Sequence, residues 1–345
     1  MDRIQKVLDH SIKNKYLFGV SMCVHQNNQD WCGTSGNFGL DSPYFIASTT
    51  KLFTSSLIFK LRALGKLDFE EQISNYLSED VIKDLHRYKG EDHSKKITIL
   101  NLLSHTSGLP DYFQTTKPFK KALENHLKEG NDAHWDFRQA IEWSKEMSPL
   151  FEPSKPHKAH YSDTNFQLLG RIVENLYENE LADILQREIC NQLELENTYL
   201  FTDPTNTQPK KMYFKSKELN IPLAMTSFRA DGGVVSTSRE LMVFLKSFMN
   251  GVLFPKSYLT EICRWNNIFF PLESGIGIHR FRPPWYFSPF RRIPEMIGHS
   301  GLSGAFAFYC QEMDTYLTGT VNQINNPGNS FKLLMRILTE LRKNS

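Results

Sequence analysis

The stretch PYFIASTTKLFTSSLIFKLRALGKL, residues 43–67, places a serine and a lysine three positions apart at the start of an apolar run. The run predicts a buried helix that begins near Ser48 and ends near Gly65. Residues three apart share one face of a helix, so the Ser48 hydroxyl and the Lys51 amine can meet. The first turn of a helix also offers backbone N–H groups to a developing oxyanion. The stretch therefore indicates a nucleophile with an activating neighbour.

An N-cap serine followed by a surface lysine would give the same spacing by chance. Lys51 is, however, preceded by the apolar residues 45–47 and followed by Leu52 and Phe53. Such neighbours make a solvated lysine less favourable. The spacing alone leaves both interpretations open.

Strand-like patterns lie at both ends of the chain, and helical patterns fill the middle. Apolar residues at helical spacing open the chain, and alternation followed by Asn27-Asn28 predicts a hairpin. Alternating runs return late, before a closing helix that carries Leu334 and Leu341, in GIGIHRF, AFAFYC and YLTGTV at residues 275–281, 305–310 and 316–321. We therefore expect an α/β sheet subdomain formed by residues 1–65 together with 265–345.

Residues 66–264 are expected to form a mostly helical subdomain, which makes one intertwined catalytic unit with the sheet. One of its helices is predicted over SRELMVFLKSFMNG, residues 238–251, with Ser238 as its cap and Gly251 at its end.

The composition is that of a compact globular protein of 345 residues with a formal net charge of +2. This balance gives no reason to expect nucleic acid or an anionic membrane as the main partner. The start of the chain lacks the apolar core of a signal peptide, and no segment has the roughly 20 apolar residues of a bilayer span. We therefore expect a cytoplasmic protein with reduced thiols, while export by another route stays open.

The five cysteines are expected mainly as small buried hydrophobes. Cys23 and Cys32 could be neighbours across the predicted hairpin, but free thiols are favoured over a disulfide there.

Two later segments can be placed beside the Ser48 stretch. Tyr161-Ser162-Asp163 comes just before a strong helical pattern, and His299-Ser300-Gly301 comes just before a strand. Ser-x-x-Lys, Tyr-x-(Asn/Asp) and (Lys/His)-x-Gly, in this order, are the three signatures of the penicillin-recognising serine hydrolases. The sequence resembles that superfamily, in the branch of class C β-lactamases, esterases, D-aminopeptidases and D-stereospecific peptidases.

The resemblance extends over about residues 15–340. The segments LLSHTSGLPDY, residues 102–112, and ADGGVVSTSREL, residues 230–241, are similar to characteristic segments of the branch. It implies an α+β fold, with an antiparallel sheet flanked by the terminal helices and a helical lobe that supplies Tyr161.

The resemblance also implies roles for individual residues. Ser48 would be the acylated nucleophile, Lys51 its activating neighbour and Tyr161 the proton shuttle. The backbone N–H groups of Ser48 and Leu302 would form the oxyanion hole. Substrate binding or support would come from the strand edge and the opposite wall of the cleft, formed by Asp163, His299, Ser300, Gly301 and Leu302. No metal or cofactor is required.

Two positions depart from the penicillin-hydrolysing pattern. Asp163 replaces the usual Asn, and a carboxylate facing Lys51 would keep the lysine charged. The ammonium would then lower the Tyr161 pKa and make Tyr161 the main proton acceptor. His299 replaces Lys, and a neutral imidazole holds a substrate carboxylate more weakly. An alternative for Asp163 is a side chain that caps the following helix.

These departures favour an ester or an amine-bearing D-amino-acyl peptide or amide over penicillin as the small-molecule substrate. Two alternatives stay open. One is a catalytically impaired binding, sensing or assembly module, and the other is a β-lactamase or DD-carboxypeptidase.

Several other features are expected to have structural roles. His157 and His160 are interpreted as solvated loop residues rather than metal ligands, and His105 as a hydrogen-bonding residue at a helix end. GHSGL differs from the G-x-S-x-G nucleophile elbow because a strand follows it. The segment 279–294 is expected to be either a lid or docking surface, with Trp285, Tyr286 and Arg292, or a hairpin that packs on its own aromatic residues.

Overall fold

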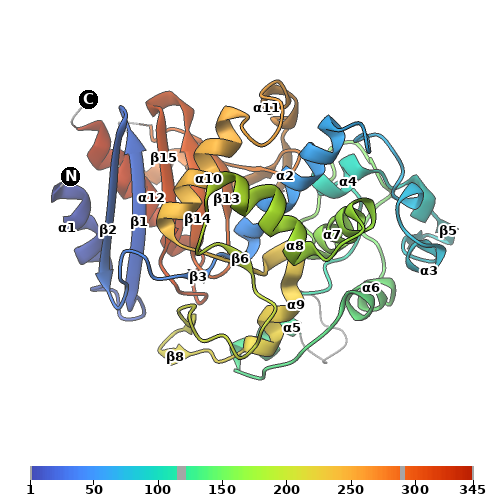
Figure 1. Ribbon diagram of the computed structural model, residues 1–345, viewed down its shortest axis with the longest axis horizontal. Helices are drawn as coiled ribbons and strands as arrows, with labels where there is room; N and C mark the ends of the chain where they lie inside the picture. The colour runs from blue at the N-terminus through green and yellow to red at the C-terminus, as the bar shows by residue number, and fades with distance from the viewer. Residues whose placement is uncertain (1, 115–121, 288–291, 344–345) are drawn as a thin grey trace.

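The computed structural model describes residues 2–114, 122–287 and 292–343. Its framework is an eight-stranded antiparallel sheet whose strands lie in the order β10-β11-β12-β13-β14-β15-β1-β2. The first two strands of the chain thus join the edge of a sheet that is otherwise built from its last third (Figure 1). The strands are β1 (Gly19–Gln26), β2 (Gln29–Gly36), β10 (Asn266–Phe269), β11 (Leu272–Ser274), β12 (His279–Phe281), β13 (Met296–Ser300), β14 (Ala305–Cys310) and β15 (Thr315–Thr320).

Alternating residues of the strands face two different apolar cores. On β1, Val20, Met22 and Val24 face the terminal helices α1 (Asp2–Ser11) and α12 (Gly328–Arg342), which pack against each other. Cys23 faces the opposite core, together with Ala305 and Ala307 of β14. The two-residue period of a strand thus buries both faces of the sheet.

The second face of the sheet carries α10 (Ser238–Asn250) and is approached by α2 (Thr50–Ala63). The side chains of Ser21 and Ser238 lie 2.8 Å apart between their oxygens, and Thr318 donates a hydrogen bond to the Ser238 carbonyl. A helix from the predicted helical middle of the chain therefore packs directly on the sheet.

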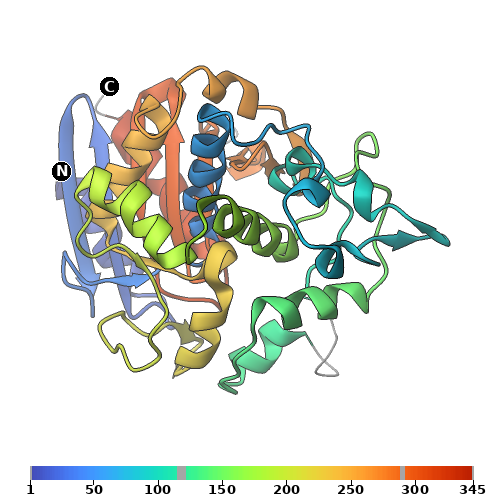
Figure 2. The ribbon, with the colours of Figure 1, turned by 45° about the vertical axis from the view of Figure 1, so that its right-hand side comes forward.

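Helix α2 is buried on nearly all sides, because it lies between the sheet and α7 (Asp163–Tyr177) (Figure 2). The lobe beyond it contains α3 (Glu79–Ile82), α4 (Ile99–Leu103), α5 (Leu123–Lys128), α6 (Phe137–Lys145), α8 (Leu181–Leu185) and α9 (Pro222–Gly232), and α11 (Tyr258–Ile262) follows α10. Short strand pairs complete the structure: β3 (Tyr44–Phe45), β9 (Val234–Ser236) and β6 (Tyr199–Leu200) form one small sheet, β4 (Arg87–Tyr88) pairs with β5 (Glu91–Asp92), and β7 (Tyr213–Phe214) with β8 (Lys217–Glu218).

Most sequence-predicted elements are present, with shifted ends. The hairpin turn at Asn27-Asn28 has two positive φ angles, as a type I′ turn requires. Helix α10 ends at Gly251 as expected, but its cap is Thr237, whose hydroxyl accepts from the Glu240 N–H, and not Ser238. In GIGIHRF only His279–Phe281 forms a strand, because Gly277 turns the chain with a φ of +70° against Ser55.

The structure corrects the expectation of free thiols at Cys23 and Cys32. The hairpin register sets the two residues directly opposite each other, with 4.1 Å between their Cα atoms, and they form a disulfide. Closely opposed positions of an antiparallel pair bring side chains within bonding distance. The other three cysteines are free, and Cys190 and Cys310 are buried as expected.

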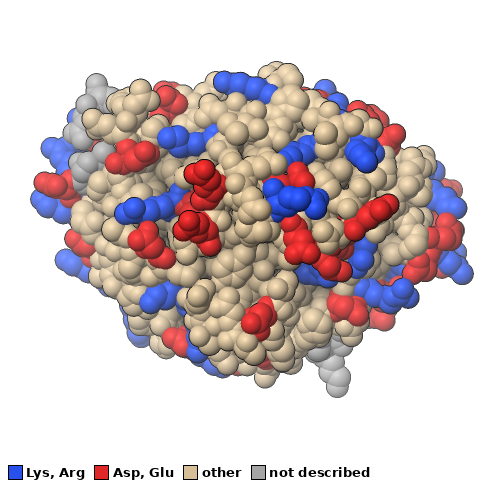
Figure 3. Space-filling view, viewed as in Figure 1, with Lys and Arg blue, Asp and Glu red and all other residues tan. Residues whose placement is uncertain are grey.

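Within the described part of the chain, no helix combines the length and apolar character needed to cross a membrane. Lysine, arginine and acidic side chains are interspersed over the face shown in Figure 3, in keeping with the small net charge.

Phe53 of α2 and Phe244 of α10 offer a test of this packing. Their rings stack with 3.6 Å between centroids, and neither residue is exposed. We expect Phe244→Ala to lower the free energy of unfolding by about 3–5 kcal/mol, because it leaves a cavity between the two helices. Val243→Ala, at a position 44% exposed on the same helix, should change it by less than about 1 kcal/mol. Equal losses in urea unfolding would contradict this arrangement.

Candidate active site

Ser48 and Lys51 lie where the chain enters α2. Ser48 is half-buried in a 3₁₀ turn, Ala47–Thr49, and Lys51 follows in the first turn of α2 with no exposed surface. The segment His299-Ser300-Gly301 lies close to this turn, and Gly301 makes this possible. A Cβ atom at Gly301 would lie 2.3 Å from the Ile46 carbonyl oxygen, so only glycine allows the end of β13 to approach so closely.

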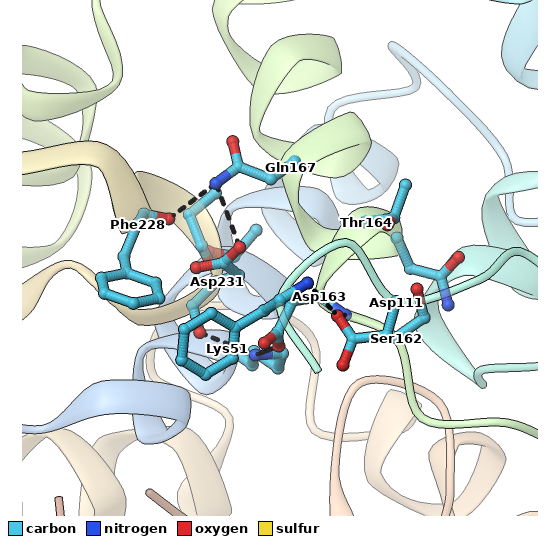
Figure 4. A network of polar contacts seen from close by, with 12 residues as sticks. Lys51, Asp111, Ser162, Asp163, Thr164, Gln167, Phe228 and Asp231 are labelled. Carbon is cyan, nitrogen blue, oxygen red and sulfur yellow. Dashed lines mark hydrogen bonds and ion pairs between the residues drawn. The ribbon is translucent and has the colours of Figure 1, made fainter. Parts of the chain in front are cut away.

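The Lys51 ammonium is bound by groups from two other helices. It donates to Asp163 Oδ1 at 2.6 Å and to the Asp231 carbonyl oxygen at 2.7 Å (Figure 4). Burial acts to lower the Lys51 pKa, but the charge of Asp163, followed by Tyr161 and Asp231, outweighs it and raises the pKa above its usual value. Lys51 is therefore a persistent ammonium and a poor base.

Asp163 faces Lys51 instead of capping its helix. Ser162 occupies the N-cap position of α7, without a side-chain capping bond, and Asp163 is the first helical residue. The ion pair is almost completely buried, with 8% of the Asp163 side chain exposed and none of that of Lys51.

Tyr161 completes the convergence of the motifs. Its phenol shares hydrogen bonds with Lys51 and Ser48, and the Lys51 Nζ lies 5.1 Å from its ring centre. Burial and then the charge of Asp163 raise the Tyr161 pKa, and the opposing effect of Lys51 is too small to reverse this. The expectation of a lowered Tyr161 pKa is therefore wrong, because it neglected desolvation. Tyr161 is a neutral phenol at neutral pH.

Two further buried carboxyl groups surround the ion pair, and sequence reasoning missed both. Asp111 accepts hydrogen bonds from the backbone N–H groups of Phe113 and Asp163, at 3.0 and 3.3 Å. Burial, followed by the charge of Asp163, raises the Asp111 and Asp231 pKa values. Asp111 lies in the segment 102–112 and Asp231 in the segment 230–241. From the sequence alone, these segments were recognised only by their similarity to the family.

Asp231 is only partly satisfied. Its Oδ2 accepts from the Tyr112 hydroxyl at 2.8 Å and from the Gln167 amide at 3.0 Å. Its Oδ1 is buried and has no hydrogen-bond partner among the described residues. A buried carboxyl oxygen without a partner is costly unless a ligand group binds it.

A pocket of about 60 Å³ opens beside Ser48. Asp163, Asp231, Ser48 and Leu302 line it, and no described lysine or arginine does. The Leu302 N–H donates to no described protein atom, which leaves it available to an oxyanion. The remaining wall is mostly apolar and consists of Ala47, Phe113, Leu127, Met212, Ile221, Met225, Phe228, Gly232, Ser303 and Ile324, with Glu124, which is paired with Lys128.

His299 does not line this pocket, contrary to the expectation that it forms the opposite wall. It is buried and stacks on His279 with 4.0 Å between ring centres, while its Nδ1 lies 2.8 Å from the Ser300 carbonyl oxygen. A carbonyl oxygen can only accept, so Nδ1 carries the proton. Burial lowers the pKa of His299 well below its usual value, so the imidazole is neutral, as expected. Ser300 is half-buried at the end of β13.

The remaining histidines have structural positions. His105 Nδ1 accepts from the Ser162 N–H and the Asn165 amide, at 3.2 and 3.1 Å, so His105 is a structural hydrogen-bonding residue as predicted. His157 is exposed and His160 is partly buried. Within residues 2–114, 122–287 and 292–343, no group of three or more histidine, cysteine or acidic side chains is arranged to hold a metal ion.

The segment 279–294 contains β12 and a short 3₁₀ turn, Trp285–Phe287. Trp285 and Tyr286 are 74% and 56% exposed, and their rings contact each other with 6.3 Å between centroids. The lid or docking surface and the aromatic-packed hairpin both stay predictions. Arg292 is also exposed, and residues 288–291 lie outside the described part of the chain.

The chain is similar to known proteins over most of its length. A family model described as "Beta-lactamase" matches residues 4–339. Among curated relatives, Beta-lactamase-like protein 4 of Dictyostelium discoideum is 29% identical over 254 residues, which is 69% of this chain and 42% of the relative. Beta-lactamase-like protein 1 of the same organism is 28% identical over 52% of this chain and 30% of its own length. The chain thus spans less than half the length of these relatives.

Solved structures share the whole fold. A D-amino acid amidase from Ochrobactrum anthropi SV3, complexed with L-phenylalanine amide, superposes with a TM-score of 0.82 and 22% identity over 99% of this chain and 98% of the other. A D-stereospecific amidohydrolase from Streptomyces sp. gives a TM-score of 0.77 and 24% identity over 96% and 97%. The expected α+β fold is confirmed.

The buried histidines predict a measurable pH dependence. Burial, and then the charge of Lys51, lower the His279 pKa to about 3. In the unfolded chain the histidine pKa is about 6.5, so between about pH 3 and pH 6.5 the unfolded chain binds more protons than the folded one. The stability that comes from the neutral, buried His279 is therefore lost as the pH falls below about 6.5. The free energy of unfolding should fall between about pH 7 and pH 5 in the parent protein. In His279→Gln we expect this fall to be smaller by about 2 kcal/mol.

The comparison with the parent isolates this effect. The raised pKa values of Asp111 and Asp231 act in the opposite direction over the same pH range, but they are present in both proteins. His10→Gln, at an exposed position, is the control and should follow the parent. A His279→Gln protein with the parent's pH dependence in urea unfolding would show that His279 is not buried in its neutral form.

Proposed function

The chain belongs to the β-lactamase family, and on this premise we propose that it is a serine hydrolase that forms an acyl-enzyme on Ser48. Its preferred substrates would be amides, peptides or esters whose acyl part is a D-amino acid with a free amine. The observation that carries this proposal is the charge of the site. Three buried carboxyl groups, Asp111, Asp163 and Asp231, surround one ammonium, Lys51.

A substrate ammonium would fit this group of carboxyls, because it would shift Asp231 toward its ionised form against the effect of burial. Asp163 and Asp231 line the pocket beside Ser48, and the buried Asp231 Oδ1 lacks a partner. An ammonium that donates to this oxygen would favour the ionised carboxylate and remove the cost of an unsatisfied acceptor. The acyl side chain would lie against the apolar wall that includes Phe113 and Phe228.

The proton route follows from the protonation states. The Ser48 oxygen attacks the substrate carbonyl, and its proton passes to the Tyr161 oxygen while the phenol proton passes to the leaving group. The carbon–nitrogen or carbon–oxygen bond then breaks, and the leaving group departs with that proton. This relay needs no free phenolate, which suits the raised Tyr161 pKa. The persistent Lys51 ammonium would stabilise negative charge that develops on the phenol.

Deacylation would run through the same groups in reverse. Water gives a proton to the Tyr161 oxygen as it attacks the ester, and Tyr161 returns a proton to the Ser48 oxygen as the acid is released. In both halves the backbone N–H groups of Ser48 and Leu302 would hold the carbonyl oxygen.

Two further observations support the substrate class. The solved structures of similar fold include a D-stereospecific amidohydrolase and a D-amino acid amidase, and a third, EstCE1, is titled a hydrolase with promiscuous acyltransferase activity. A β-lactam carboxylate is disfavoured, because the carboxyl groups of Asp163 and Asp231 line the described pocket and no described lysine or arginine does.

Covalent labelling tests the nucleophile. We expect a fluorophosphonate to modify Ser48, with the adduct located by mass spectrometry, and a fluorescent penicillin to label it at least about tenfold more slowly, since repulsion of about 1.4 kcal/mol already has this effect. Ser48→Ala is the control and should not react at that position. Absence of labelling at Ser48 by both reagents would favour the alternative of a binding module. Faster labelling by penicillin would contradict the charge argument.

Asp231 gives a sharper test of the amine. With D-alanine p-nitroanilide, Asp231→Asn should lower kcat/KM by about ten- to a hundredfold, the effect of losing a hydrogen bond to a charged group. With N-acetyl-D-alanine p-nitroanilide, which has no ammonium, the change should be less than about threefold. Glu124→Gln is the matched control, because this pocket carboxylate is already paired with Lys128. Equal losses on both substrates would mean that Asp231 does not bind the amine.

A further inference from the structure

One of the aromatic rings beside Tyr161 is exposed. Three described rings lie against the Tyr161 ring, those of His105, His279 and Phe269, with 4.7, 5.7 and 6.4 Å between centroids. His105 and His279 are buried, whereas Phe269 is 53% exposed. Of these three rings, Phe269 is therefore the one that a bound molecule can reach.

Phe269 lies apart from the pocket that would hold the acyl group. That pocket is lined by Ser48, Leu302 and residues of the helical lobe, and Phe269 is not among them. Phe269 is instead the last residue of β10, the edge strand of the large sheet, and its ring meets that of Tyr161 at 80°, edge to face. An edge-to-face contact leaves much of the Phe269 ring open to another apolar group.

We propose that Phe269 selects the leaving group of the substrate. This inference rests on the proposed function, in which Tyr161 gives its proton to the leaving group, so that group must contact the phenol. The acyl part occupies the pocket on the Ser48 side, and the exposed ring beside Tyr161 faces whatever extends beyond the scissile bond. An aromatic or extended apolar leaving group would cover Phe269, whereas ammonia or methylamine would not reach it.

Phe270 provides the matched control. It is the next residue, it is 74% exposed, and it makes no ring contact with Tyr161 among the described residues. It lies in the turn that follows β10. Replacing Phe270 therefore removes a similar exposed ring at the hairpin end without touching the leaving-group position.

The test uses D-alanine benzylamide and D-alanine methylamide, which share the acyl group and release amines of similar chemistry. Phe269→Ala should lower kcat/KM for the benzylamide by about three- to tenfold, the value of an aromatic contact, and change it for the methylamide by less than about twofold. The deacylation rate of the common D-alanyl-enzyme should not change, because the leaving group has already departed. Phe270→Ala should match the parent on both substrates, and Phe269→Tyr should retain the preference.

The outcomes separate two kinds of failure. Equal losses on both amides, or a slower deacylation, would show that Phe269 supports Tyr161 rather than contacting the leaving group, and would overturn this inference alone. Absence of turnover of either amide by the parent protein would overturn the proposed function, and the role of Phe269 with it.

Discussion

The buried ion pair between Lys51 and Asp163 is the constraint on which the rest of the structure depends. Removing two charges from water costs several kcal/mol for each, so such a pair persists only with short contacts and further hydrogen bonds. The 2.6 Å contact and the Asp231 carbonyl oxygen meet this requirement. These two contacts also connect α2 to α7 and α9. They explain why α2, which is buried on nearly all sides, can contain a charged lysine.

Burial and the ion pair together set the protonation of the surrounding groups. Burial is the main reason why the imidazoles of His279 and His299 stay neutral, and the Lys51 ammonium adds to it by opposing further positive charge. Burial, and then the charge of the Asp163 carboxylate, keep the proton on Tyr161 and raise the Asp111 and Asp231 pKa values. The proposed proton relay through a neutral phenol, and a substrate that brings its own positive charge, would suit these protonation states.

The sheet and the helical lobe bring the other groups of the site to the ion pair. The sheet brings the end of β13 against the turn before α2, where only Gly301 fits beside Ile46. The helical lobe brings Tyr161 and the carboxyl groups from the opposite side. The reacting groups therefore lie at the seam between the layers, and the sheet edge adds an exposed aromatic ring at Phe269. In the proposed mechanism, helices and strands on both sides would hold the oxyanion donors and the phenol in position before substrate binds.

The sequence by itself determined the local elements and the family. Periodicity indicated the hairpin, the terminal helices and the late strands, and three short motifs identified Ser48, Lys51 and Tyr161, because these signals depend on residues close together in the chain. Only the tertiary structure decided that Asp111 and Asp231 join Asp163, that His299 stacks behind the site on His279, that Cys23 bonds to Cys32, and that the Tyr161 pKa rises. Burial and Coulomb forces depend on distances in space, and Lys51 is 112 residues from Asp163 and 180 from Asp231 along the chain.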